Sequence, residues 1–149
     1  MITIRVCRVD ERRELVELQR RASLANLGDR EAMLAHPEAV DTPLEQFEAG
    51  QVFLAEDDGH VLGFAAVVPR DDGSAELDAL FVEPGLWRAG VGSALVAYAV
   101  AQARRAGHRT LQVIGNPHAA DFYRSVGFVE VGRVATQFGH GPLFEMPLN

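Results

Sequence analysis

Residues 84–95, PGLWRAGVGSAL, place Gly90 and Gly92 where a strand-like pattern changes into a helix-like one. Glycines at the start of a helix either make a tight turn or let an anionic ligand reach bare backbone. The first amides of a helix lack partners within it, and the aligned peptide dipoles add about half a positive charge, so a phosphate is a natural ligand there. The stretch lacks the third glycine of a dinucleotide fingerprint and the Lys-Ser/Thr pair of a P-loop. Read alone, it leaves both interpretations open.

The elements on either side of this turn predict how the sheet is built. Three strand-like runs precede it, at 51–57, 58–69 and 75–84, joined by the Asp-Gly turns DDGH and DDGS. They predict an antiparallel meander. After the turn comes a largely buried helix over 91–106 and then a strand over 110–115. Because a long helix separates the last two strands, we expect a parallel crossover between them.

The rest of the chain adds strands and helices to both ends of this unit. Residues 2–9 alternate like a strand, and a helix begins at Asp10 and ends at Gly28. The remaining predicted elements are short helices over 30–35 and 44–49, a helix over 116–127, and closing strands over 128–134 and 143–148. Together they predict one domain over residues 1–149 of the α/β (α+β) class, with a mixed, mostly antiparallel sheet of six to seven strands and about four flanking helices.

Composition excludes several classes of protein. At 149 residues with 48% hydrophobic side chains, the chain is typical of one globular domain. The longest nearly apolar run, residues 94–103, is about half of the roughly 20 residues that span a bilayer, and the first residues lack the order of a signal peptide. We therefore expect a cytoplasmic protein with no membrane partner. Cys7 is the only cysteine, in an apolar strand, and is interpreted as buried filler.

Charge is unevenly distributed along the chain. The net charge of −7 argues against a nucleic-acid partner. Acidic residues dominate up to residue 83, whereas arginines exceed acids after it, and the chain has no lysine. Such an arrangement suits a protein that attracts a cation with its first half and binds an anion with its second. Uneven surface solvation is the alternative.

A second motif covers residues 116–128, NPHAADFYRSVGF. Tyr123, with an ordinary pKa of about 10, is protonated at neutral pH and can give a proton to a departing thiolate. The alternatives are structural: Tyr123 as a core aromatic and Asn116 as the N-cap of the helix. Spacing alone favours these structural roles.

The two motifs, in this order, resemble the GNAT superfamily of N-acetyltransferases over about residues 52–133. The family's V-x-P strand end and Arg/Gln-x-x-Gly-x-Gly/Ala turn are matched by Val82, Pro84, Gly90 and Gly92. Its later segment, N-x-x-A-x-x-F-Y-x-x-x-G-F, is matched at Asn116, Ala119, Phe122, Tyr123, Gly127 and Phe128. One position departs: Trp87 stands where the family usually has Arg or Gln, and Arg88 follows it.

The resemblance implies a binding site for acetyl-CoA as co-substrate. In the family, the strand corresponding to 75–84 splays from the parallel strand that follows, the pantetheine arm pairs with main-chain groups in the gap, and one amide polarises the thioester. Tyr123 would protonate the leaving thiolate, and Asn116 would bind the arm. The coenzyme-binding residues implied in this way are Leu80, Phe81, Val82, Trp87, Arg88, Ala89, Gly90, Val91, Gly92, Ser93, Asn116 and Tyr123.

A primary amine with a pKa near 10.4 is almost fully protonated at pH 7, so attack on a thioester needs a base. Glu76 and Asp78 are two residues apart on one strand, so we expect them on the same side, roughly 7 Å apart, together with Leu80 and Val82. Glu76 sits where some family members carry the base and is placed first, with Asp78 second. A solvated strip at the start of a strand is the alternative.

The resulting hypothesis is direct, acetyl-CoA-dependent N-acetylation of a primary amine on a small, cationic molecule. One alternative is an acetyltransferase for protein or peptide N-termini or lysines, and another is a non-catalytic acyl-CoA sensor module. The five histidines show no metal-binding spacing, so no metal is expected. Many relatives are dimers, and residues 141–148 suit either a closing strand or the contact of a homodimer.

Overall fold

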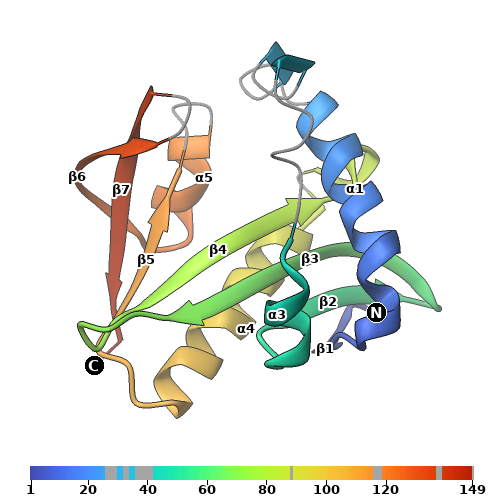
Figure 1. Ribbon diagram of the computed structural model, residues 1–149, viewed down its shortest axis with the longest axis horizontal. Coiled ribbons are helices and arrows are strands. Elements are labelled where there is room, and N and C mark those ends of the chain that lie inside the picture. Colours follow the sequence, from blue (N-terminus) through green and yellow to red (C-terminus); the bar gives the residue numbers. More distant parts are fainter. Residues whose placement is uncertain are drawn as a thin grey trace.

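A computed structural model describes residues 1–25, 30–31, 34–35, 42–87, 89–115, 119–136 and 139–148 (Figure 1). The strands are β1 (Thr3–Val6), β2 (Val52–Asp57), β3 (His60–Pro69), β4 (Ala75–Val82), β5 (Thr110–Ile114), β6 (Val129–Thr136) and β7 (Gly139–Pro147). The helices are α1 (Arg12–Ala25), α3 (Leu44–Glu48), α4 (Val91–Arg105) and α5 (Ala120–Ser125), with single 3₁₀ turns η1 (Val9–Glu11) and η3 (Pro84–Leu86).

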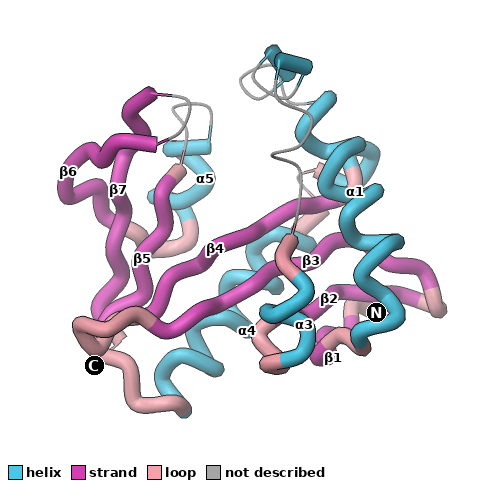
Figure 2. Tube along the Cα trace, viewed as in Figure 1, coloured by secondary structure: helices cyan, strands magenta, loops and turns pink. Residues whose placement is uncertain are grey.

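The strands form one seven-stranded sheet in the order β1-β2-β3-β4-β5-β7-β6. All neighbours are antiparallel except β4 and β5, which are parallel. Figure 2 shows the chain leaving β4, running back through α4 and entering β5. The predicted mixed sheet, the meander and the parallel crossover are therefore confirmed. A helix as long as α4 brings the chain back to the end of the sheet at which β4 begins, so β5 runs in the same direction as β4.

Two hydrophobic cores lie on opposite faces of the sheet. On one face α4 packs behind β2–β4, where Leu95 joins Phe53 (Figure 1). On the other face α1 and α3 lie in front, where Leu15 packs with Phe64. Cys7 belongs to this second core and is 6% exposed, and burial raises the pKa of its thiol to about 12. A thiol so hard to ionise fits the interpretation of Cys7 as a buried filler.

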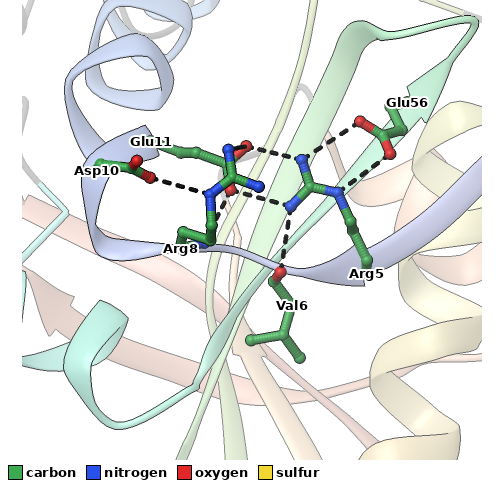
Figure 3. Close-up of polar contacts among 6 residues, drawn as sticks. All are labelled: Arg5, Val6, Arg8, Asp10, Glu11 and Glu56. Atoms are coloured by element: carbon green, nitrogen blue, oxygen red, sulfur yellow. Dashed lines mark hydrogen bonds and ion pairs between the residues drawn. The ribbon is translucent and has the colours of Figure 1, made fainter.

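An ion-pair network fastens the start of α1 to the edge of the sheet (Figure 3). The Arg5 guanidinium in β1 binds Glu11 of η1 at 2.7 Å and Glu56 of β2 at 3.1 Å. The backbone amide of Arg8 donates to Glu11 at 2.8 Å. These bonds, that from Arg5 above all, lower the pKa of Glu11 to about 2. The network fixes where the first helix leaves the sheet.

Candidate active site

The parallel strands β4 and β5 pair only where they begin. Their register contains two pairs, Ala75 with Leu111 and Glu76 with Gln112, and beyond these the strands diverge (Figure 1). Over the same length β4 stays paired with β3, and β5 stays paired with β7. We call this divergence, beyond Glu76 and Gln112, the fork. It opens toward the carboxyl ends of the two strands, which is where α/β sheets commonly bind ligands.

A β-bulge in β4 reverses its side-chain alternation inside the fork. Ala66 of β3 faces Ala79, whereas the next residue of β3 faces Leu77, so Asp78 has no partner on β3. Leu77 packs in the core beside α4, but Ala79 packs in the core beside α1. A bulge inserts one residue into a period of two, so later side chains change face.

The bulge corrects one expectation about β4. Leu80 and Val82 pack in the core beside α4, on the opposite face from Glu76, so the predicted common side for all four residues is wrong for these two. Strict alternation would have kept them together. An extra residue in the register is a property of the strand pair, which the sequence of one strand does not reveal.

The main chain of β4 presents two residues to the fork. The amide of Glu83 donates to the carbonyl of Leu62 at 2.9 Å, so Val82 occupies a non-hydrogen-bonded position of the β3–β4 ladder. At such positions the N–H and C=O groups point away from the partner strand, and Leu80, two residues earlier, is equivalent. Phe81 between them bonds toward β3. Of the three predicted pantetheine contacts, Leu80 and Val82 therefore have backbone groups facing the fork.

Glu76 and Asp78 form a pair of interacting carboxyl groups at the closed end of the fork. Burial, followed by the Asp78 carboxyl, raises the pKa of Glu76, and Arg70 partly offsets this. The Glu76 side chain is 15% exposed and its Oε1 lies 2.7 Å from Nη1 of Arg70. Asp78 accepts a hydrogen bond from Nε2 of Gln46 at 2.8 Å. A carboxylate with a raised pKa is better suited to take a proton near neutral pH.

The two glycines of the turn have different conformations and surroundings. Gly90 precedes α4 with φ of 87°, a left-handed conformation, and a Cβ there would meet nothing within 4 Å. A Cβ on Gly92 would lie 3.1 Å from the ring of Phe122. The space beside Gly90 is therefore open to a ligand, whereas the space beside Gly92 is filled by α5.

The first turn of α4 leaves three amides without an acceptor inside the helix. Its first helical hydrogen bond is donated by Ala94 to the carbonyl of Gly90 at 3.1 Å, so the amides of residues 91–93 have no acceptor within the helix. The side chain of Val91 is buried in the core, at 2% exposure, and that of Ser93 is exposed. Val91 can therefore offer a ligand only its backbone.

Trp87 closes the loop between β4 and α4. Its indole Nε1 donates to the carbonyl of Val82 at 3.1 Å, while the side chain remains 45% exposed. One residue after β4, Glu83 accepts two hydrogen bonds of 2.9 Å from Arg21 of α1. The loop is thus fixed to both β4 and α1. The Val82 carbonyl bound by Trp87 is one of the groups that face the fork.

Tyr123 lies in the core on the α4 side of the sheet. It is 8% exposed, its ring centroid is 5.4 to 5.7 Å from those of Phe122, Phe128 and Phe144, and the ring lies over Gly115 at the end of β5. The ring therefore has the packing role expected of a core aromatic. Of the other implied coenzyme contacts, Ala89 is exposed in the turn before α4, and Arg88 and Asn116 lie outside the described residues.

Two residues of this site were not predicted from the sequence. The first is Arg70. Arg70 and Glu76 lie on either side of the DDGS turn with opposite charges, and that pattern is a signal for a cross-strand ion pair. The second is Gln46, which lies 32 residues before Asp78 in a short helix without a motif. Only the folded chain brings its amide to the bulge.

Other features of the molecule lie apart from the fork. A cavity of about 270 Å³ borders the C-terminal half of α4, with Tyr98, Gln102 and His108 among its lining residues. In the part of the chain that the structure describes, no group of three or more His, Cys, Asp or Glu side chains could hold a metal ion. None of the described helices is long and apolar enough to cross a membrane.

Comparison with known proteins gives one family and many similar folds. The model of the acetyltransferase (GNAT) family matches residues 15–128. No curated protein matches the sequence significantly.

Several solved structures share the fold along nearly the whole chain. PaiA N-acetyltransferase from Thermoplasma acidophilum, in complex with coenzyme A, is 18% identical over 99% of each chain, with a TM-score of 0.78. YncA from Salmonella typhimurium, with its cofactor acetyl-CoA, is 22% identical over 100% of this chain and 95% of that one, with a TM-score of 0.75. The ribosomal-protein-S18-alanine N-acetyltransferase from Escherichia coli is 21% identical over 100% and 95%, with a TM-score of 0.73.

Proposed function

The chain belongs to the GNAT family of acetyltransferases, and from this premise we propose that it transfers an acetyl group from acetyl-CoA directly to a primary amine of a small, cationic molecule. The observation that carries the proposal is the fork, with backbone groups of Leu80 and Val82 facing it and the Glu76–Asp78 pair at its closed end. In this proposal the thioester-binding edge and the base would lie on the same strand.

The coenzyme would bind along β4 and at the start of α4. Acetyl-CoA supplies the activated acyl group, and two of the similar structures contain coenzyme A or acetyl-CoA. The edge of Leu80 and Val82 offers donors and acceptors for the amides of a pantetheine arm. The open space at Gly90 and the first-turn amides, which have no acceptor inside the helix, fit a pyrophosphate.

Glu76 would accept the proton of the amine. Its raised pKa makes it a stronger base than an ordinary carboxylate, and it lies in the last register pair before the fork opens. Asp78 adds a second negative charge, so the pair favours an ammonium over a neutral ligand. This preference agrees with the acidic first half of the chain, which supplies α1 and α3.

Tyr123 would return a proton to the coenzyme thiolate. Its ring lies at the carboxyl end of β5 on the α4 side, whereas Glu76 lies on the other face of the sheet. The base and the acid would therefore approach the fork from opposite faces. This arrangement lets an amine enter from the α1 side while the coenzyme occupies the α4 side.

The test is thiol release from acetyl-CoA in the presence of a diamine, a polyamine, an aminoglycoside and a peptide amine. We expect release with a small cationic amine, and a loss of about 100-fold or more in Glu76→Gln and in Tyr123→Phe. Matched controls are Glu48→Gln, an exposed carboxylate of α3, and Tyr98→Phe, the other tyrosine of the chain.

Two results would contradict the proposal. Release with peptide or protein amines alone would exclude a small acceptor and favour the protein acetyltransferase. Tight acetyl-CoA binding without release by any amine would indicate a sensor module instead of an enzyme.

A further inference from the structure

The carboxylate that the bulge displaces is held by a side chain from another element. Asp78 has no partner on β3, so the strand pairing does not fix the direction of its side chain. Nε2 of Gln46, in α3, donates to its Oδ2 at 2.8 Å. The bond joins residues 32 positions apart and ties α3 to the bulge.

The amide of Gln46 makes this bond at a cost. Its Oε1 is buried and has no hydrogen-bond donor among the described residues. A buried acceptor without a donor is unfavourable and rare. Turning the amide would place Oε1 against the Asp78 carboxylate, two acceptors with no proton between them. The observed orientation therefore lets the amide donate to Asp78.

We propose that Gln46 is a positioning residue that holds the Asp78 carboxylate beside Glu76, so that Glu76 is the carboxylate of the pair that takes up a proton. The inference rests on the proposed function, in which Glu76 is the base. Gln46 touches neither reacting group and acts through Asp78.

The charges around Glu76 support this assignment. Burial and then Asp78 raise the pKa of Glu76. Arg70, which directly follows β3, lowers it. Among the other polar groups on nearby elements are Gln112 of β5, Glu145 of β7, which binds Gln112, Gln19 of α1, which binds Thr42, and Glu45 and Glu48 of α3. Of all these, Asp78 is the negative charge that acts on Glu76, and Gln46 binds it.

The test is a carbon-detected NMR titration of the carboxyl groups in the full chain, without substrate. We expect Gln46→Met to lower the titration midpoint of Glu76 by about half to one pH unit, because Asp78 is then free to turn toward solvent. Asp78→Asn should lower it at least as far. In the Asp78→Asn background, Gln46→Met should change it by less than about 0.3 pH unit.

Gln102→Met, in α4, is the matched control and should leave Glu76 unchanged. Gln46→Asn, one methylene too short to reach, is a milder variant that should shift the midpoint in the same direction. An unchanged Glu76 midpoint in Gln46→Met would overturn the proposal. So would an equal shift with and without Asp78, because Gln46 would then act by another route.

The titration distinguishes failure of this proposal from failure of the proposed function. It needs no turnover, so the coupling of Gln46, Asp78 and Glu76 is measured even if no amine is acetylated. Where turnover occurs, the acidic limb of the pH profile of kcat/KM should move with the titration midpoint of Glu76. That limb reports the pKa of the essential base in the free enzyme. A limb that stays in place while Glu76 shifts would show that Glu76 is not the base.

Discussion

The ring of Phe122 lies against Gly92, with its Cζ 3.1 Å from where a Cβ would stand. Gly92 belongs to α4, which follows β4, and Phe122 belongs to α5, which follows β5. The contact therefore joins the two helices across the open end of the fork. It holds together two strands that share only two register pairs.

Gly92→Ala should destabilise the protein through Phe122. Alanine is favoured over glycine in a helix by about 1 kcal/mol, but its methyl would overlap the ring, and overpacking costs about 1–3 kcal/mol. In a Phe122→Leu background the overlap is relieved, so the same change should stabilise. Urea unfolding of the four variants measures the coupling between the residues. Equal effects of Gly92→Ala in both backgrounds would contradict the contact.

Trp87 should report coenzyme binding by its fluorescence. It is the only tryptophan, is 45% exposed, and covers the Val82 carbonyl on the edge proposed for the pantetheine arm. Coenzyme A and a pantetheine fragment should both change its emission, whereas 3′,5′-ADP should change it less. Binding detected by calorimetry with no change in emission would place the arm elsewhere.

Gly63→Ala should be strongly destabilising. Its Cβ would lie 2.7 Å from the carbonyl oxygen of Phe81, a backbone atom of β4 that cannot turn aside. We expect a loss of about 1–3 kcal/mol, measured as a lower midpoint in urea. Gly132→Ala is the matched control, because this strand glycine has nothing within 4 Å of its Cβ position. Similar losses in both variants would mean that β3 and β4 can separate at little cost.

Stability should fall in acid through Glu11. Its pKa is lowered from 4.5 to about 2 by Arg5, so its contribution is complete above about pH 4.5 and is lost as the pH falls toward 2. The contribution is at most about 3 kcal/mol. Unfolding free energies at pH 7 and pH 3 should differ less in Glu11→Gln than in the parent. Glu14→Gln, an exposed carboxylate of α1, should keep the parent's difference.

Much of the fold was predictable because it depends on short-range pattern. The alternation in residues 75–82, the Asp-Gly turns and the spacing of α4 predicted the meander and the parallel crossover that the structure contains. Gly90 was predicted to begin α4 and does so with a left-handed φ of 87°. These features depend on residues close together in sequence, since turns and helix ends are set by local conformational preference.

The candidate site was only partly predictable. Glu76 and Asp78 were expected together and interact, but Leu80 and Val82 lie on the other face because of the bulge. Trp87, which replaces the usual Arg or Gln of the family, could not be interpreted from the sequence. The structure gives it a partner, the Val82 carbonyl at 3.1 Å.

The sequence by itself determined where the strands, the glycine turn and the carboxylates lie along the chain, because each depends on residues within a few positions. Only the tertiary structure decided that Asp78 is the bulged residue, that Gln46 binds it, and that the ring of Phe122 packs against Gly92. The register between two strands and the contact between distant helices depend on how whole elements pack. The local sequence pattern does not specify which distant residue each side chain contacts.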